Sequence, residues 1–185
     1  MSIRFVALDL GGVLVDVDLQ HIRATYNHAA LFAKHDALSE GALAEADFIS
    51  DAASRMNVDA ATLRDDWCRV VKPSRGSQAL LNQLRVPSTA WSNTDPMHAA
   101  ALASLSCLND RAALSFAVGA QKPQRAFYQA ARSKLPFAPS EILFVDDREE
   151  NVGAARSMGV CADVVRGIDE TRALLLSYGL LHEES

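Results

Sequence analysis

The first strongly patterned segment of the chain is the apolar run Phe5-Val6-Ala7-Leu8, which ends at Asp9 and is soon followed by two glycines. A short apolar run bounded by turn residues is typical of a β-strand that is buried on both faces. In open α/β sheets, ligands bind beyond the carboxyl ends of such strands. An acidic residue at that end either opens a turn or belongs to a site. The rest of the pattern has to decide between these two interpretations.

Between Asp16 and Lys72 the apolar positions recur at helical spacing. They form three sets: Leu19, Ile22, Tyr26, Ala29 and Ala33; Ala42, Ala46, Ile49, Ala53 and Met56; and Leu63, Trp67, Val70 and Val71. This spacing places apolar side chains on one face of a helix. Asp59 precedes the third set and is a suitable N-cap. We therefore expect an all-helical block in this part of the chain.

From Pro87 onward, strand patterns alternate with helical patterns. The expected strands are Thr89-Ala90-Trp91, Leu114 to Val118, Ile142 to Val145 and Ala162 to Val165. Strands that alternate with helices indicate βαβ units and a parallel sheet. We predict an α/β fold with a Rossmann-like parallel sheet flanked by helices. Its core comprises residues 1–15 and 73–185, and the small helical block, residues 16–72, is inserted after the first strand.

Composition and charge are those of an ordinary globular protein. The 185 residues carry a net charge of -5, which argues against nucleic acid or an anionic membrane surface as a partner. No apolar run approaches the roughly 20 residues that a membrane span needs. The first strand follows the N-terminus without a cationic and apolar leader, so we expect a cytoplasmic protein. The three cysteines are widely spaced and are expected to be buried thiols.

Polar residues follow the predicted strands at four places. These are Asp9, Ser92-Asn93, Lys122 and Asp146-Asp147. Because the carboxyl ends of parallel strands share one edge of a sheet, we expect these side chains to converge. Three carboxylates close together raise one another's pKa, and Mg²⁺ with oxygen ligands removes that conflict. Ser92 and Asn93 can donate to phosphate oxygens, and Lys122 can neutralise a phosphoryl charge. The pattern thus predicts an oxygen-ligated metal beside an anion.

The order of these motifs resembles that of the haloacid dehalogenase (HAD)-like hydrolase superfamily. The motifs are Asp9-Leu10-Gly11-Gly12-Val13, Ser92-Asn93-Thr94, Lys122-Pro123, and Asp146-Asp147 with Asn151. The chain is most similar to the small-capped (C1) phosphatase branch that includes bacterial glucose-1-phosphatases, with residues 16–72 as the cap. The resemblance implies a Mg²⁺-dependent phosphatase that acts through an aspartyl-phosphate intermediate. Its substrate would be a small phosphorylated metabolite, with phosphorylated sugars favoured.

The resemblance also implies catalytic and metal-binding roles for individual residues. Asp9 would be the nucleophile and a metal ligand, and Lys122 would screen Asp9 and stabilise the intermediate. The other implied metal ligands are Gly11, through its carbonyl oxygen, with Asp147 and the neighbouring Asp146. Which of the two adjacent aspartates binds the metal directly is left open at this stage.

Further residues would bind the substrate or support the site. Ser92 and Asn93 would bind the transferring phosphoryl group. Asp16, together with Asp18 and the cap, would contact the leaving group. Asn151 lies one helical turn beyond the second aspartate of its motif and is expected to orient that side chain. The implied partner is a small-molecule substrate, and the protein is expected to be a monomer or a homodimer.

Gly11 departs from the family pattern, in which an aspartate at this position acts as an acid and then as a base. General acid–base help contributes about 10²–10⁴-fold to a rate. Its loss is serious for a poor leaving group and less so for a sugar 1-phosphate or an acyl phosphate. The similar glucose-1-phosphatase branch also has glycine here.

The departure at Gly11 keeps two alternatives open. One is a metal-independent 2-haloacid dehalogenase, in which the halide leaves without a proton; the pair Asp146-Asp147 speaks against it. The other is a non-catalytic protein that binds a phosphate ligand.

Overall fold

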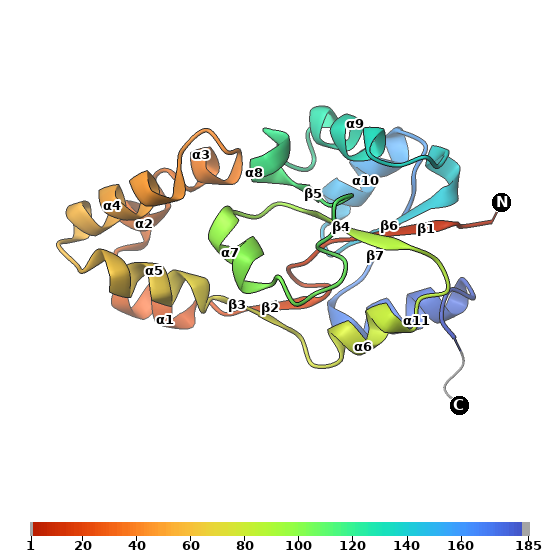
Figure 1. The fold of residues 1–185 in the computed structure, drawn as a ribbon, viewed down its shortest axis with the longest axis horizontal. Helices are drawn as coiled ribbons and strands as arrows, with labels where there is room; N and C mark the ends of the chain where they lie inside the picture. Colours follow the sequence, from red (N-terminus) through yellow and green to blue (C-terminus); the bar gives the residue numbers. More distant parts are fainter. Residues whose placement is uncertain (1, 183–185) are drawn as a thin grey trace.

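The computed structural model describes residues 2–182, and its central element is a parallel sheet (Figure 1). Within these residues the main sheet has five strands in the order β5-β4-β1-β6-β7, and every neighbouring pair is parallel. The strands are β1 (Phe5–Leu8), β4 (Ser88–Ser92), β5 (Ala113–Leu114), β6 (Ile142–Asp146) and β7 (Cys161–Val164). The predicted α/β fold with a Rossmann-like parallel sheet is thereby confirmed.

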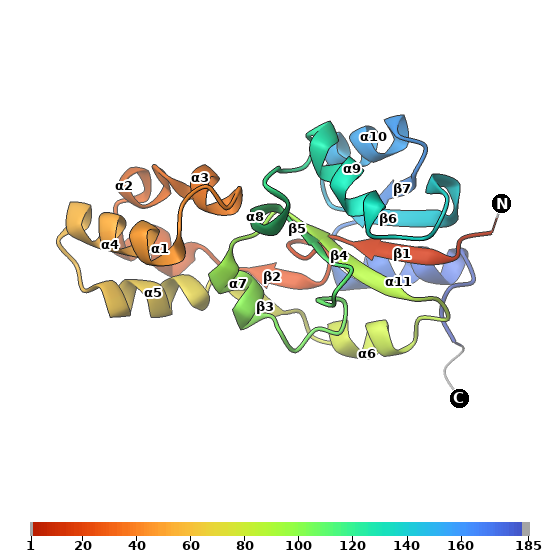
Figure 2. The same cartoon turned by 45° about the horizontal axis from the view of Figure 1, so that its top comes forward.

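Helices cover both faces of this sheet, as Figure 2 shows. They are α9 (Arg125–Ser133) and α10 (Glu149–Ser157) on one face, and α6 (Ser77–Asn82) and α11 (Gly167–Ser177) on the other. Successive residues of β1 serve opposite faces. Phe5 and Ala7 pack in the cluster under α9 and α10, whereas Val6 and Leu8 pack in the cluster under α6 and α11. Burial on both faces explains why this strand is a continuous apolar run.

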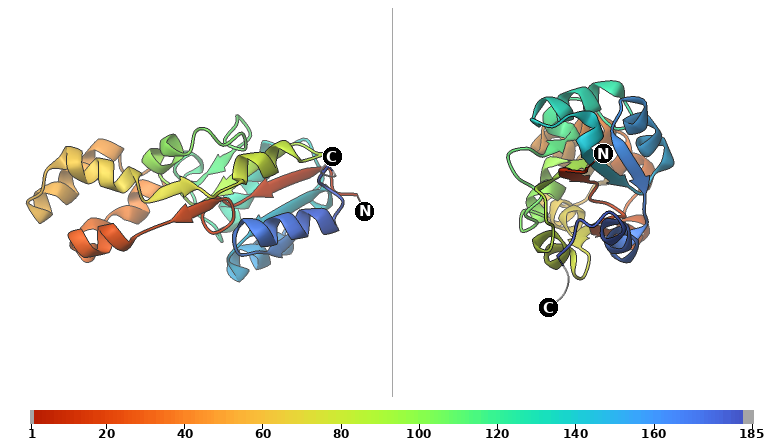
Figure 3. Two further views of the ribbon diagram at one scale, coloured as in Figure 1. Left: turned by 90° about the horizontal axis from the view of Figure 1, so that it is seen from below. Right: turned by 90° about the vertical axis from the view of Figure 1, so that its right-hand side faces the viewer.

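The helical block lies at the end of the molecule remote from both termini (Figure 3). It contains α1 (Gln20–Thr25), α2 (His28–Phe32), α3 (His35–Ser39), α4 (Glu45–Met56) and α5 (Ala60–Cys68). We call this block, residues 18–70, the helical lobe. Its own buried cluster includes Phe48 and Trp67. Two short strands that the sequence pattern did not predict, β2 (Val15–Val17) and β3 (Val71–Pro73), form an antiparallel pair that joins the lobe to the core.

Buried contacts also fasten the helical lobe to the core. Asp95, the N-cap of α7 (Pro96–Ala101), accepts a hydrogen bond of 3.1 Å from the indole Nε1 of Trp67. The ring of His98 stacks on Trp67, and its Nε2 lies 2.9 Å from the carbonyl oxygen of Trp67. At a second point, a Cβ atom added to Gly41 would lie only 2.1 Å from the carbonyl oxygen of Phe116. The lobe is therefore packed against the core at two places besides the connecting strands.

The strand expected from Leu114 to Val118 was wrong for most of its length. β5 ends at Leu114, and a helical turn, α8 (Ser115–Val118), follows it. The reason is Ser115, whose buried hydroxyl donates to the carbonyl oxygen of Thr94 and accepts from its N–H. These two bonds turn the chain away from the sheet, and Gly119, with φ of 75°, ends the turn.

The helical spacing of residues 19–33 covers two helices rather than one. α1 ends at Thr25 and α2 begins at His28, because Asn27 adopts an extended conformation and its side chain caps α2 through Ala30 N. The predicted cap at Asp59 is confirmed, since its carboxylate accepts from Thr62 N at 2.8 Å. A single 3-10 turn, η1 (Pro139–Glu141), leads into β6. No helix of residues 2–182 is long and apolar enough to cross a membrane.

Candidate active site

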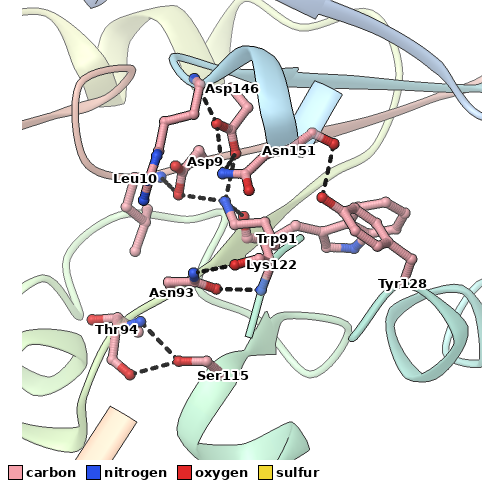
Figure 4. A network of polar contacts seen from close by, with 11 residues as sticks. Asp9, Leu10, Trp91, Asn93, Thr94, Ser115, Lys122, Tyr128, Asp146 and Asn151 are labelled. Carbon is pink, nitrogen blue, oxygen red and sulfur yellow. Dashed lines mark hydrogen bonds and ion pairs between the residues drawn. The ribbon is translucent and has the colours of Figure 1, made fainter. Parts of the chain in front are cut away.

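The carboxyl ends of β1, β4 and β6 meet around the buried side chain of Lys122 (Figure 4). Its Nζ lies 3.0 Å from Asp9 Oδ1, 2.6 Å from Asp146 Oδ2 and 2.8 Å from the carbonyl oxygen of Trp91. An ammonium group has three N–H donors, and here each has an acceptor. Lys122 therefore holds the two carboxylates at a common point, and these residues come from distant parts of the chain.

Asn93 holds the backbone of Lys122 in place. Its Nδ2 donates to the carbonyl oxygen of Lys122 at 2.9 Å, and its Oδ1 accepts from Lys122 N at 2.8 Å. Both ends of this amide are thus engaged by the loop that carries the lysine. Neighbouring Ser92, at the end of β4, lies close enough to Asp9 for its side chain to lower the pKa of that carboxyl group. The positioning role of Asn93 is one that sequence reasoning missed, because the pairing joins segments 29 residues apart.

Asp146 is fully engaged by protein donors. Asn151 Nδ2 lies 2.9 Å and 3.1 Å from its two carboxylate oxygens, and Arg148 N donates to Oδ1 at 2.9 Å. The expectation that Asn151 orients Asp147 was therefore wrong. Asp146 faces the N-terminus of α10, where the Asn151 side chain can reach it, whereas Asp147 points towards the loop that follows β1.

Asp147 lies directly against Gly12. A Cβ atom added to Gly12 would be 2.5 Å from Asp147 Oδ2, and the φ of Gly12 is 71°, in the region that favours glycine. Asp9, Asp146 and Asp147 each offer a carboxylate oxygen, and these atoms all lie within 4.8 Å of one another. Burial, and then the charge of Asp146, raise the pKa of Asp147. The second glycine of the first motif thus lets a third carboxylate approach the other two.

The donor set fits an oxygen-ligated divalent cation. Three carboxylates converge, and Gly11 and Asn151 line the same cavity. The Oδ1 of Asn151 is buried and has no hydrogen-bond partner among residues 2–182. An unpaired buried acceptor needs a donor, and a water of the Mg²⁺ hydration shell is one. The arrangement is therefore chemically suited to a divalent cation that keeps part of its hydration shell.

Burial raises the pKa of Asp9 to about 6, which the nearby charge of Lys122 only partly offsets. The charge of Asp146 acts in the same direction as burial, while the hydrogen bond from Ser92 opposes it. Leu10 N also donates to Asp9 Oδ1 at 2.7 Å. In the protein without a cation, this carboxylate is thus poised to take up a proton within the range of ordinary buffers.

A cavity of about 700 Å³, which we call the polar cavity, is lined by most of these groups, but not by Asp146 or Ser92. The site residues that line it are Asp9, Gly11, Gly12, Asp16, Asn93, Lys122, Asp147 and Asn151. Asp16 lies at the exposed rim and accepts a hydrogen bond from Ser74 Oγ. Asp18, expected beside it, lies elsewhere, because its carboxylate caps Gln20 N and lines a separate surface cavity. The cavity is much larger than a phosphate group and leaves room for the remainder of a small substrate.

Gly12→Ala is expected to weaken Mg²⁺ binding at least about tenfold, as loss of a residue that positions a metal ligand does. The added methyl group would push Asp147 away from the other carboxylates. Gly179→Ala is the matched control, since Gly179 has a similar φ of 67° but nothing lies within 4 Å of its added Cβ. Titration calorimetry with Mg²⁺ checks the difference. Equal Mg²⁺ affinity in the two variants would show that the contact with Asp147 is unimportant.

The raised pKa of Asp9 predicts a pH dependence of stability in EDTA. Between the ordinary value of 3.8 and about 6, the folded protein keeps a proton that the unfolded chain has lost. The free energy of unfolding therefore falls as the pH rises through this window, by roughly 3 kcal/mol at most. Asp9→Asn has no titrating group at this position, so its free energy of unfolding lacks this pH-dependent contribution. Urea unfolding should therefore show the variant gaining stability relative to the wild type from pH 4 to pH 7. Parallel pH profiles for the two proteins would contradict the assignment.

Comparison with known proteins identifies the fold. No protein-family model and no curated protein sequence matches the chain. It is similar to the structure of a HAD family enzyme from Bacteroides thetaiotaomicron in complex with magnesium and inorganic phosphate, with a TM-score of 0.78 and 21% identity over 89% of this chain and 95% of that one. It is also similar to a predicted HAD-like family hydrolase from Porphyromonas gingivalis, with a TM-score of 0.70 and 21% identity over 90% and 92% of the two chains.

A third similar structure is L-2-haloacid dehalogenase from Xanthobacter autotrophicus, with a TM-score of 0.61 and 23% identity over 97% of this chain and 84% of that one. The chain therefore has the fold of the HAD-like superfamily. At these identities the likeness concerns the fold, and the narrower resemblance to the glucose-1-phosphatase branch stays a prediction.

Proposed function

We propose that this protein is a Mg²⁺-dependent phosphatase that hydrolyses a small phosphorylated metabolite through an aspartyl-phosphate intermediate. The observation that carries the proposal is the placement of Asp9. Its carboxylate lies 3.0 Å from the buried ammonium of Lys122 and shares a cavity with Asp147. A nucleophile, a fixed positive charge and a set of hard oxygen donors thus meet at the edge of a parallel sheet, where ligands of such folds bind. The similar enzymes of HAD fold, one with magnesium and phosphate, support this proposal.

The residues of the site have distinct roles in this mechanism. Asp9 attacks phosphorus, and Lys122 offsets the negative charge that builds up beside it. Bound Mg²⁺ would supply the further positive charge that lets phosphoryl oxygens and carboxylates share the site. Asp9, Asp147 and the Gly11 carbonyl would hold it, because Asp146 already accepts from Lys122, Asn151 and Arg148.

The remaining residues would bind the substrate and set specificity. Ser92, which lies against Asp9, would donate to the phosphoryl group, and Asn93 keeps the lysine loop beside it. Residues 16–72 would act as a cap, with Asp16 at the rim of the cavity. Gly11 supplies no proton donor, so the reaction is best suited to a leaving group that departs as a stable anion.

The proposal is tested with a panel of phosphate esters that includes p-nitrophenyl phosphate and sugar 1-phosphates. We expect phosphate release with Mg²⁺, its loss in EDTA and its return when Mg²⁺ is restored. Asp147→Asn should weaken Mg²⁺ binding in calorimetry and lower turnover in parallel. Asp163→Asn should do neither, because Asp163 does not line the cavity and pairs with Arg156 instead. If sugar phosphates bind but no product forms at any Mg²⁺ concentration, the protein is a non-catalytic binding protein and the phosphatase proposal fails.

A metal-independent 2-haloacid dehalogenase is the second candidate. It is favoured by Gly11, since halide leaves with its bonding electrons and needs no proton. An apolar cavity beside Asp9 would also suit a carbon substrate. The converging carboxylates of Asp146 and Asp147 argue against a dehalogenase, because metal-independent dehalogenation gives these carboxylates no metal ion to bind. Halide release from a 2-haloacid in EDTA, with no phosphate release from any ester, would establish this candidate.

A further inference from the structure

A second cavity, of about 180 Å³, lies between the helical lobe and the core, next to the polar one. We call it the apolar cavity. Phe32 and Trp67 of the lobe line it together with Val17 and Val71 of the connecting strands and Leu102 of the core. An apolar cavity of about 150 Å³ accommodates a benzene molecule in another protein. The apolar cavity is therefore large enough for one ring or a branched aliphatic group.

Gly11 joins the two cavities. It lines both of them, as does Val17, whose side chain is 51% exposed. A Cβ atom added to Gly11 would point at Val17 Cγ2, 3.4 Å away. A side chain at position 11 would therefore contact Val17, which lines both cavities. Asn93 lines both cavities as well, and Ser92, whose side chain lowers the pKa of Asp9, lines the apolar cavity. The apolar cavity therefore adjoins the site around Asp9.

Two polar residues in the wall of the apolar cavity, Asp95 and His98, are engaged with each other and with Trp67, and the Asn93 amide is engaged by the backbone of Lys122. Asp95 accepts from Trp67 Nε1 and from the backbone N–H groups of Met97 and His98. The two ring nitrogens of His98 lie 3.0 Å from Asp95 Oδ2 and 2.9 Å from the carbonyl oxygen of Trp67. The other polar side chains in the wall are those of His35, Ser92 and Thr94. A sugar carries a hydroxyl group on most of its carbons, so a sugar placed here would lose hydrogen bonds to water that the wall replaces only in part. An apolar group has no hydrogen bonds to lose, and the removal of its surface from water favours binding.

We propose that the substrate's leaving group is a flat or branched apolar group of about the size of a benzene ring, carried on an acidic oxygen as in an aryl, enol or acyl phosphate, and that it occupies the apolar cavity. This inference rests on the proposed phosphatase function, and it replaces the sugar favoured by the sequence resemblance. Asp9 forms a bond to phosphorus while the bond from phosphorus to the leaving oxygen breaks. That oxygen keeps the electron pair, departs as an anion and takes its proton from solvent. The absence of an acid at position 11 and the apolar character of the cavity thus suit the same substrate.

The test compares phenyl phosphate with acetyl phosphate, whose leaving group is too small to need the apolar cavity. Val71→Phe narrows the cavity, and Val58→Phe is the matched control, because Val58 is a half-buried residue of the lobe that does not line it. We expect Val71→Phe to lower kcat/KM for phenyl phosphate at least about tenfold, since burial of a ring contributes this much to binding. The value for acetyl phosphate should stay within about twofold, and Val58→Phe should change neither. An equal loss for both substrates, no loss for phenyl phosphate, or a preference of the wild type for a sugar phosphate would overturn the inference.

A binding measurement separates this inference from the proposed function. Phenylphosphonate and methylphosphonate cannot be hydrolysed, so their binding does not depend on turnover. We expect phenylphosphonate to bind at least about tenfold more tightly than methylphosphonate in the presence of Mg²⁺, and Val71→Phe to remove that difference. If no ester is hydrolysed but this preference is found, the phosphatase proposal fails and the apolar cavity stands as a ligand site. If the esters are hydrolysed but phenylphosphonate binds no more tightly than methylphosphonate, the phosphatase proposal stands and the inference about the apolar cavity fails.

Discussion

Asp9→Asn is expected to lower the turnover of p-nitrophenyl phosphate by roughly 10⁴- to 10⁶-fold, the scale of loss when a covalent nucleophile is removed. Asparagine has nearly the same shape and keeps an oxygen that can accept from Leu10 N, so the loop after β1 should keep its conformation. The neutral amide is a far weaker nucleophile than a carboxylate, and it cannot form the acyl phosphate. The measurement is kcat at saturating substrate and Mg²⁺.

Asp110→Asn is the control for this substitution, because Asp110 is exposed and does not line the polar cavity. It should retain the activity of the wild type. Mass spectrometry after rapid quenching should show a phosphorylated protein for the wild type and none for Asp9→Asn. If kcat of Asp9→Asn lies within tenfold of the wild-type value, Asp9 is not the nucleophile.

Lys122→Met is expected to destabilise the metal-free protein by about 3–5 kcal/mol, as removal of one partner from a buried ion pair does. Its ammonium is the buried cation that contacts both Asp9 and Asp146, and methionine fills the space without replacing the charge. The two carboxylates would then remain close together without compensation. Urea unfolding in EDTA at neutral pH measures the loss. Addition of Mg²⁺ should restore part of the stability, because a bound cation again offsets the carboxylates.

Two further variants separate the charge effect from the loss of a buried side chain. Lys134→Met is the control, because Lys134 donates to the carbonyl oxygen of Ala112 and has no ion pair with a carboxylate among the described residues. Its cost should be about 1 kcal/mol, the usual contribution of one hydrogen bond. The double variant Lys122→Met/Asp146→Asn should be more stable than Lys122→Met alone, because one uncompensated charge is removed. Equal losses in Lys122→Met and Lys134→Met would show that the carboxylates do not depend on Lys122.

Local pattern was sufficient where neighbours in the chain decide the structure. The run from Phe5 to Leu8 is buried on both faces, and Asp59 caps a helix through Thr62 N, three residues away. Pattern failed at Ser115, where alternating apolar residues predicted a strand. The deciding contacts there are hydrogen bonds to Thr94, 21 residues earlier, and no local signal contains them.

By itself, the sequence determined the α/β fold and the set of polar residues that converge at one sheet edge. This was possible because the side chains at the ends of parallel strands share an edge whatever the details of packing. Only the tertiary structure decided that Asn151 serves Asp146, that Asn93 holds the Lys122 loop, and that an apolar cavity opens beside Gly11. Each of these depends on where a side chain points, or on how the helical lobe packs against the core. Contacts between segments distant in the chain set both of these features, and such contacts leave no periodic signal in the sequence.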